Sequence, residues 1–491
     1  MSRDRLWLAI AILLPALAAT IAPLSTVDLA YQVRAGELML ASTSVLRTDP
    51  FTFTAFGAPW LDQQWAAGVV FALVHGLAGW GGLVILRAVL VAAAVGLTAA
   101  GARRWLTGRT ATLAALAGFL VGIASLGLRA QLFGVALFAA VVAILAWRDR
   151  RPRLAWAIPL LVLAWANLHG SFFLGPAAVA AAFLADLVAR RPGLRRLGAV
   201  FVLSLVAACV TPFGPDVWGY ALGIATNPEI ARLVTEWQRT SPFTVTGAVF
   251  YASVLGVAWL LVRARRIDAL PAWPVLAWLA GLAVLGAWAE RGVAWWAFGA
   301  PVALAPTVAA LLGSRRVPSG AQRHGQAAPA GSPPPGTRRL RRLNVVLVLL
   351  LGALVVAAQP AWRGGDPVTG PAGLLRDAPA GVARALAALA GPADRAVVPQ
   401  PWASWLIWAA PGVPVMIDSR IEVAPPSAWT DYAMIVGGGA DTLATLDRIG
   451  ATVVVVDPAT QPRLELALRT PGGGWREVYA DGDGVVFAPA P

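Results

Sequence analysis

Cysteine, histidine and lysine are nearly absent from this sequence. Its 491 residues include one cysteine, three histidines and no lysine, and only 13% of them are charged. With Cys209 alone, an intrachain disulfide and a cysteine metal cluster are excluded. Cys209 lies in an apolar run, where we expect it to pack as a small apolar side chain. We interpret the missing lysine as a compositional bias of the genome and not as a functional feature.

The chain is rich in apolar residues. They make up 58% of the sequence, the mean hydropathy is +0.68, and there are 22 tryptophans. These values are typical of a membrane protein and exclude a soluble protein of this length. The net charge of +14 comes from arginines beside apolar runs, where cations meet lipid headgroups. We therefore expect membrane lipid and no nucleic acid as a partner, and most tryptophans as membrane-interface anchors.

Arginine clusters alternate with loops that carry most of the acidic residues. The clusters lie at 103–104, 148–153, 190–196, 263–266 and 338–342; the other loops lie at 26–64, 129–131, 168–171, 213–243 and 289–292. Because cytoplasmic loops of membrane proteins are enriched in arginine, this pattern predicts a multi-pass protein of the cytoplasmic membrane. It also predicts a cytoplasmic N-terminus and acidic loops on the outer side.

The apolar runs predict about eleven transmembrane helices. The first covers residues 6–25, for which a cleaved signal peptide is the alternative. The others lie near 82–101, 111–128, 131–147, 154–168, 172–189, 197–212, 245–262, 270–288, 293–312 and 343–359. Residues 64–80 are apolar but short, and counting them as a span would place Arg103 and Arg104 outside. We expect a helix in the outer interface there.

This reading divides the chain into four parts. Residues 1–312 form the transmembrane module, whose first outer loop covers 26–81. A basic, proline-rich linker, disordered and cytoplasmic, covers 313–342, and the last span covers 343–359. Residues 360–491 are expected to form a small extracytoplasmic α/β domain. Its predicted helices are 380–390 and 440–449, and its predicted strands are 396–398, 415–417, 452–456, 477–479 and 484–487.

The first outer loop carries the densest polar chemistry. Asp28 comes three residues after the first apolar run, so its carboxylate is expected at the boundary between membrane and water. One interpretation makes Asp28 the N-cap of a helix over 29–40. The other makes it a general base that activates a hydroxyl arriving from outside. The two interpretations are compatible.

A set of motifs runs in order along the chain. The loop contains VDLAYQVRAGELML (27–40) and TDPFTFTAFGAPWLDQQWAAGVVFAL (48–73), and later segments read LRAQLF (128–133), WANLHGS (165–171), TPFG (211–214) and IDSR (417–420). Together they resemble a bacterial branch of polytopic GT-C glycosyltransferases. Ala30 and Gln32 depart from that branch, which has an aromatic residue and a histidine at these positions. The resemblance implies a GT-C-like fold: polytopic α-helical, with the C-terminal extracytoplasmic α/β domain.

The resemblance also implies an activity: transfer of a sugar from a polyprenyl-phosphate donor to a glycan, lipid or protein acceptor on the outer face, with inversion. Asp28 would be the catalytic carboxylate. Because a buried phosphate needs cations or donors, we expect Arg129, Arg291 and His169 to bind it, with Arg87 as a further candidate. Simpler alternatives remain, such as an ion pair between Arg291 and Glu290. The expected substrate-binding residues are Gln32, Arg34, Asp49, Asp62, Trp65, Asn167, Glu236, Asp418 and Arg420.

The sequence predicts no metal site, because it has no Asp-x-Asp and no histidine or cysteine pair at ligand spacing. A divalent cation held by Asp28, Asp49 and Asp62 is the alternative. Two other functions compete with the enzyme: a non-catalytic protein that binds a lipid-linked glycan, and a transporter. Polar residues that gather at one face disfavour the transporter, because transporters carry charges near the middle of the membrane.

Overall fold

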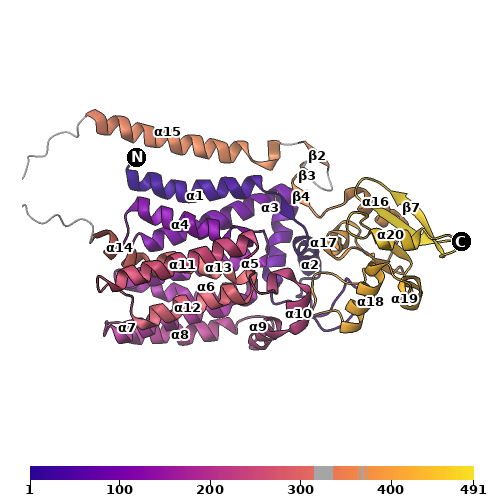
Figure 1. Cartoon of the computed structure of the whole chain (residues 1–491), viewed down its shortest axis with the longest axis horizontal. Helices are drawn as coiled ribbons and strands as arrows, with labels where there is room; N and C mark the ends of the chain where they lie inside the picture. Colours follow the sequence, from indigo (N-terminus) through magenta and orange to yellow (C-terminus); the bar gives the residue numbers. More distant parts are fainter. Residues whose placement is uncertain (314–334, 363, 367–369, 372) are drawn as a thin grey trace, which may run out of the picture.

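A long bundle of helices carries a small mixed domain at one end (Figure 1). The computed structural model describes residues 1–313, 335–362, 364–366, 370–371 and 373–491. Most of the linker expected at 313–342 therefore lies outside the described residues. Both ends of this gap, at α14 and at the start of α15, lie at the end of the bundle opposite to the small domain.

The helical part follows the apolar runs of the sequence. Its helices are α1 (Arg3–Ile21), α2 (Leu29–Ser42), α3 (Trp65–Ala102), α4 (Gly108–Gly122), α5 (Ala130–Ala146), α6 (Ile158–Leu168), α7 (Leu174–Val188), α8 (Leu194–Ala208), α9 (Asp216–Thr226), α10 (Pro228–Leu233), α11 (Val245–Arg265), α12 (Trp273–Trp288), α13 (Val293–Ala303), α14 (Ala305–Gly313) and α15 (Pro335–Ala357). In the described part of the chain, six helices are long and apolar enough to cross a membrane, or seven with the bent pair 290–303 and 305–313. Shorter apolar helices lie between them, and the chain is a multi-pass membrane protein.

Small residues allow the helices to approach one another closely. A Cβ placed on Gly118 of α4 would lie 2.2 Å from the carbonyl oxygen of Ala297 in α13. A Cβ on Gly101 of α3 would lie 3.1 Å from the Cα of Ala143 in α5. Such contacts are typical of helix packing in lipid, where van der Waals contact replaces the hydrophobic effect between helices.

Helix α3 is broken near its middle. Ala78 and Gly79 have non-helical backbone angles, and Gly79 has a φ of +58° that glycine adopts without strain. The break divides α3 close to the boundary predicted between 64–80 and 82–101.

Arg87 lies in the part of α3 after this break. Its guanidinium donates hydrogen bonds to the carbonyl oxygens of Ala19, Ala22 and Pro23, at the C-terminal end of α1. It thus satisfies carbonyls that the end of a helix leaves without partners. The sequence suggests Arg87 as a phosphate ligand. In the structure its guanidinium instead binds the carbonyl groups at the C-terminal end of α1.

The arginine clusters meet at the end of the bundle opposite to the small domain. Arg104 pairs with Asp149 at 2.6 Å, and Arg148 pairs with Asp186 at 2.6 Å. Arg191 lies 3.4 Å from the same Asp186 carboxylate. Clusters at 103–104, 148–153 and 190–196 are therefore neighbours in space, as their common assignment to one side of the membrane requires.

The C-terminal domain has a four-stranded sheet of order β5-β6-β8-β7. The strands are β5 (Ala396–Val397), β6 (Val453–Val456), β7 (Trp475–Ala480) and β8 (Val485–Pro489); the helices are α16 (Ala380–Leu389), α17 (Gln400–Ala409), α18 (Pro426–Gly437), α19 (Thr442–Ile449) and α20 (Pro462–Leu468). The predicted helices at 380–390 and 440–449 and the terminal hairpin are confirmed. The strand predicted at 415–417 is wrong: Val415 forms only isolated bridges, to Thr52 and Ala396.

Strand pairing and hydrogen bonds join the C-terminal domain to the segment that follows α1. Strand β1 (Leu24–Ser25) pairs in parallel with β4 (Leu375–Arg376), and the short strands β2 (Gly365–Asp366) and β3 (Gly370–Pro371) lie nearby in sequence. The N–H of Phe53 donates to the carbonyl of Val415 at 2.9 Å. The backbone N–H of Tyr31 in α2 donates to the Ser404 hydroxyl of α17 at 2.8 Å. Residues far apart in sequence thus form one hydrogen-bonded junction.

Candidate functional site

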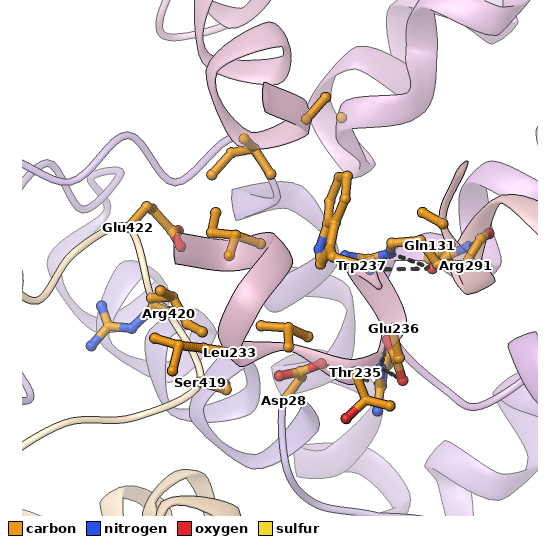
Figure 2. Close-up of a pocket in the computed structure, with 18 of the residues that line it drawn as sticks. Asp28, Gln131, Leu233, Thr235, Glu236, Trp237, Arg291, Ser419, Arg420 and Glu422 are labelled. Atoms are coloured by element: carbon orange, nitrogen blue, oxygen red, sulfur yellow. Dashed lines mark hydrogen bonds and ion pairs between the residues drawn. The ribbon is translucent and has the colours of Figure 1, made fainter. Parts of the chain in front are cut away.

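A cavity of about 1060 Å³ lies where the helical bundle meets the C-terminal domain (Figure 2). Helix ends and connecting loops of the bundle supply most of its polar side chains, and the C-terminal domain supplies the facing wall. Of the residues expected at the site, the cavity is lined by Asp28, Gln32, Arg129, His169, Glu236, Arg291 and Arg420. The cavity therefore gathers residues from both ends of the chain.

Asp28 and Glu236 share one arginine. Asp28 Oδ2 lies 3.2 Å from Nε of Arg129, and Arg129 Nη1 contacts both carboxylate oxygens of Glu236. Burial alone lowers the pKa of Arg129, but attraction to Asp28 and Glu236 outweighs burial and raises it. Asp28 does stand before α2, yet its side chain makes no capping hydrogen bond. Its carboxylate is therefore directed to Arg129 and not to the helix end.

Arg291 contacts neutral groups. Its Nε and Nη2 both donate to Gln131 Oε1 at 3.2 Å, and its guanidinium lies 4.8 Å from the centre of the Trp237 ring. Figure 2 shows this pair beside Trp237, at the edge of the labelled cluster. Within the described ranges, no carboxylate forms an ion pair with Arg291, including neighbouring Glu290. Its positive charge is thus available to an anion in the cavity.

His169 is a neutral hydrogen-bonding group. Burial, and secondarily Arg291, lower the pKa of His169 to about 3. The backbone N–H of Ser171 donates to His169 Nδ1 at 3.2 Å, and the Ser171 hydroxyl lies 2.7 Å from the same nitrogen. Because Nδ1 accepts, the ring proton belongs on Nε2. His169 can therefore donate a hydrogen bond to a ligand, but it adds no positive charge at neutral pH.

Gln32 lies in a group of amides beside Asp28. Its Nε2 donates to Gln64 Oε1 at 3.1 Å, while its own Oε1 is buried and has no hydrogen-bond partner among the described atoms. Gln63 Nε2 donates to the Ala166 carbonyl at 2.6 Å, which ties the loop before α3 to the end of α6. These amides form an uncharged part of the cavity wall.

Several expected site residues lie behind the cavity wall. Asn167 Oδ1 accepts from the Trp65 indole at 3.0 Å, and its Nδ2 donates to the carbonyls of Leu163 and Val210 at 2.9 Å each. Arg34 pairs with Glu37 at 3.0 Å, and Glu37 accepts a hydrogen bond from the Trp408 indole of α17 at 3.2 Å. These residues do not line the cavity. Their hydrogen bonds and ion pair position the elements that do.

Asp49, Asp62 and Asp418 also lie behind the wall. Asp49 Oδ1 and Asp418 Oδ2 lie 2.7 and 2.5 Å from Nη2 of Arg420. Asp62 accepts the backbone N–H of Gln64 at 3.2 Å and is 8% exposed. In the described part of the chain, no three acidic, histidine or cysteine side chains form a group able to hold a metal. Asp28, Asp49 and Asp62 therefore do not converge.

Arg420 is enclosed by aromatic rings. Its guanidinium lies 4.4 Å from the centre of the Trp60 ring, 5.0 Å from Phe51 and 5.3 Å from Tyr31. In Figure 2 the guanidinium points away from Asp28. Burial alone lowers the pKa of Arg420, but Asp418 and Asp49 outweigh burial and raise it. The arginine thus joins the first outer loop to the C-terminal domain.

Some cavity residues were not anticipated from the sequence. Gln131 lies within the LRAQLF motif, so its place in the motif was a usable signal. Tyr220 and Glu422 carry no such signal: they come from α9 and from the loop after Arg420, and only the fold brings them together. Trp429 lines the cavity. Trp65, expected to bind substrate, instead contacts Asn167, and Trp60 contacts Arg420.

Comparison with known proteins rests on structure alone. No protein-family model matches the chain, and no curated protein matches its sequence. Among solved structures, the oligosaccharyltransferase AglB from Archaeoglobus fulgidus, in complex with an inhibitory peptide and a dolichol-phosphate, matches with a TM-score of 0.58. That match has 12% identity and covers 100% of this chain and 75% of AglB.

A second similar structure is ArnT from Cupriavidus metallidurans bound to undecaprenyl phosphate. The TM-score is 0.53 at 17% identity, with 99% of this chain and 98% of ArnT covered. Both matches extend over nearly the whole of this chain, so they include the helical bundle and the C-terminal domain together. This chain therefore has the fold of GT-C-type glycosyltransferases.

Proposed function

We propose that the protein is a membrane glycosyltransferase that moves a hexosyl or pentosyl group from a polyprenyl-phosphate donor to an acceptor on the outer face of the cytoplasmic membrane. The acceptor is a glycan, a lipid or a protein. The N-terminus and the arginine clusters would be cytoplasmic, and the C-terminal domain extracytoplasmic. The AglB and ArnT structures, with dolichol-phosphate and undecaprenyl phosphate respectively, support a lipid phosphate as the donor's carrier.

The observation that carries this proposal is the pairing of a carboxylate and two arginines in one cavity. Asp28 and Arg129 are 3.2 Å apart, and Arg291 lines the same cavity with only uncharged contacts in the described chain. Glycosyl transfer from a lipid phosphate needs both groups: a base for the incoming hydroxyl, and positive charge for the departing phosphate.

In the proposed reaction, Asp28 accepts the proton of the acceptor hydroxyl. The hydroxyl oxygen forms a bond to the anomeric carbon while the bond from that carbon to the phosphate oxygen breaks. The electron pair leaves with the phosphate, whose added negative charge is stabilised by Arg291, by Arg129 and by the N–H of His169. Attack opposite to the leaving phosphate inverts the anomeric carbon.

Within this proposal, Arg129 has a further role before the reaction. Its contact with Asp28 holds that carboxylate at the wall of the cavity, where an acceptor hydroxyl can reach it. Donor phosphate would compete with the carboxylates for the same guanidinium. Binding of the donor would then loosen the pair and free Asp28 for the acceptor.

Asp28→Asn tests the base. Asparagine keeps the shape of the side chain but cannot accept a proton, so we expect turnover to fall about a hundredfold to ten-thousandfold. Both forms would be purified in nanodiscs, compared for thermal stability, and assayed with a panel of polyprenyl-phosphate sugars and acceptors. Undecaprenyl phosphate binding should be retained or become tighter, because Arg291 keeps its contacts and Arg129 loses a competing carboxylate.

Asp4→Asn is a matched control, since Asp4 lies near Gly108 at the other end of the bundle. Wild-type turnover in Asp28→Asn would remove Asp28 as the base. Donor binding without turnover in the wild type, across the whole panel, would favour the alternative of a non-catalytic protein that binds a lipid-linked glycan.

A further inference from the structure

The charges of the cavity are divided between its two walls. On the bundle side lie the arginines already described, Arg129 and Arg291, with Asp28 and Glu236. On the side of the C-terminal domain, the charged lining residues in the described chain are Arg420 and Glu422. Behind the wall, Arg420 is paired with two carboxylates, Asp49 and Asp418. This side of the cavity therefore carries negative charge, and Glu422 is the acid that faces the cavity.

Glu422 is held by a tyrosine of the bundle. The Tyr220 hydroxyl donates to Glu422 Oε1 at 2.9 Å, which joins α9 to the loop before α18. Figure 2 shows the Glu422 carboxylate turned toward the cluster of cavity residues, whereas the Arg420 guanidinium is turned away. The Glu422 side chain is accessible from the cavity. Protein surrounds it on the other sides, and this burial raises the pKa of the Glu422 carboxyl.

Uncharged polar and aromatic groups surround this carboxylate. Gln400, Trp429 and Tyr432 line the same wall. The Tyr432 hydroxyl accepts the Gln400 backbone N–H at 2.7 Å, which joins the beginning of α17 to α18. Trp429 is 8% exposed, and its indole N–H has no hydrogen-bond partner among the described residues. This wall thus combines aromatic surface, amide and hydroxyl groups with one acid.

We propose that this wall, formed by Tyr220, Gln400, Glu422, Trp429 and Tyr432, binds the acceptor, and that the acceptor presents an uncharged, hydroxyl-rich glycan. The proposal rests on the proposed function and adds the class of the second substrate. Hydroxyl groups donate strong hydrogen bonds to a carboxylate, and the faces of sugar rings pack on aromatic side chains. An acceptor group with its own phosphate or carboxylate would be repelled by Glu422.

The division of charge also orients the two substrates. The donor phosphate lies on the bundle wall near the arginines, and the acceptor glycan approaches from the opposite wall. Asp28 lies on the bundle side, so an acceptor hydroxyl must reach across the cavity to meet it.

Binding of simple sugars tests the wall without knowledge of the natural acceptor. Full-length protein in nanodiscs would be titrated with maltose, methyl α-D-mannopyranoside, glucose 6-phosphate and methyl glucuronide, with binding followed by saturation-transfer NMR. We expect the uncharged sugars to bind and the anionic ones to bind more weakly. Glu422→Gln should weaken binding of the uncharged sugars roughly tenfold to a hundredfold, because it removes a charged hydrogen-bond acceptor.

Two further variants complete the comparison. Tyr220→Phe keeps the ring and removes the hydroxyl, and should weaken sugar binding less than Glu422→Gln. Asp431→Asn is the control, because Asp431 lies on α18 but pairs with Arg448 outside the cavity at 2.7 Å. It should bind sugars like the wild type.

Undecaprenyl phosphate binding is measured in parallel. If the wild type does not bind undecaprenyl phosphate, that result counts against the proposed function. The sugar titrations still test whether the wall binds a glycan. Three results would overturn the inference: unchanged sugar binding in Glu422→Gln, tighter binding of the anionic sugars, or no binding of any uncharged sugar at the highest soluble concentration.

Discussion

Individual side chains in the cavity differ in how firmly the protein holds them. Arg129 is fixed between Asp28 and Glu236, whereas Arg291 is held by an amide and by the face of an indole. An anion that enters the cavity must break ion pairs to reach Arg129, but displaces only neutral contacts at Arg291. Arg291 is therefore expected to contribute more to the affinity for a lipid phosphate.

Arg291→Ala should weaken undecaprenyl phosphate binding by about tenfold to a hundredfold, the usual value of a charge-assisted hydrogen bond. Arg232→Ala is the control, because Arg232 is an exposed arginine paired with Glu229 at 2.7 Å. Binding would be measured by microscale thermophoresis in detergent. Equal affinities of Arg291→Ala and the control would show that the phosphate is held elsewhere.

Asp62 should make the stability of the protein depend on pH. Burial raises the pKa of the Asp62 carboxyl to about 7, whereas in an unfolded chain it is about 4. Between these values the folded protein binds more protons than the unfolded chain, so this group lowers stability as the pH rises from about 4 to about 7. Asp62→Asn cannot ionise and should remove that part of the dependence, on the order of 2–4 kcal/mol.

The measurement is thermal unfolding of both forms at several pH values in one detergent. The difference in melting temperature, variant minus wild type, should increase toward neutral pH and then level off. Parallel curves for the two forms would contradict the raised pKa of Asp62.

Among the helices, α2 places the reactive groups most directly. Asp28 precedes its first turn, and the helix lies directly against α3, where a Cβ on Gly36 would be 2.1 Å from the carbonyl oxygen of Gly68. No side chain fits at this crossing. Gly36 therefore fixes how deeply α2, and with it Asp28, lies in the junction.

Gly36→Ala should destabilise the protein by about 1–3 kcal/mol, because overpacking forces the helices apart. Transfer activity should fall with it, since Asp28 moves relative to Arg129. Gly76→Ala in α3 is the matched control, because a Cβ there meets nothing within 4 Å. A melting temperature of Gly36→Ala equal to that of the control would mean that α2 and α3 are not in this contact.

The sequence predicts elements best where hydropathy or local turns determine them. The helices of the bundle, α16 and α19 follow from apolar runs, and the hairpin of β7 and β8 follows from the turn sequence DGDG at 481–484. The region around Val415 was predicted as a strand from its apolar residues, but its partners lie in the first outer loop and in β5. Local patterns carry no information on such distant pairing. Helices α17 and α20 were also not predicted, because their tryptophans, prolines and short lengths give a weak helical period.

The site residues also divide into those that local sequence patterns identify and those that only distant contacts bring together. Asp28, Arg129, His169 and Arg291 were selected because they lie next to apolar runs or within motifs, and the cavity brings them together. Arg420 was selected from its motif, but its cage of Tyr31, Phe51 and Trp60 depends on contacts between distant segments. The Tyr220 and Glu422 pair depends entirely on such contacts.

For the whole molecule, the arrangement of charge predicts orientation. The arginine clusters lie at one end of the bundle and the C-terminal domain at the other. With Cys209 replaced by alanine, single cysteines at Ser319 and Ala459 should differ in their reaction with an impermeant maleimide in intact spheroplasts. We expect labelling at 459, which is exposed in the C-terminal domain, and none at 319 before lysis.

Lysed membranes provide the control, because both sites should react when both faces are open. Labelling at 319 but not at 459 in intact spheroplasts would reverse the proposed orientation. It would also place the cavity on the cytoplasmic side.

The pairing of β1 with β4 sets an order of events during biosynthesis. Leu24 and Ser25 leave the ribosome early, yet their partners Leu375 and Arg376 follow some 350 residues later. Contacts so distant in sequence form late. Until the last quarter of the chain has been translated, Asp28 has no covering domain and Arg420 is missing from its cage. A prematurely terminated chain would insert its helices but lack the cavity, and its uncovered junction would be open to quality-control proteases.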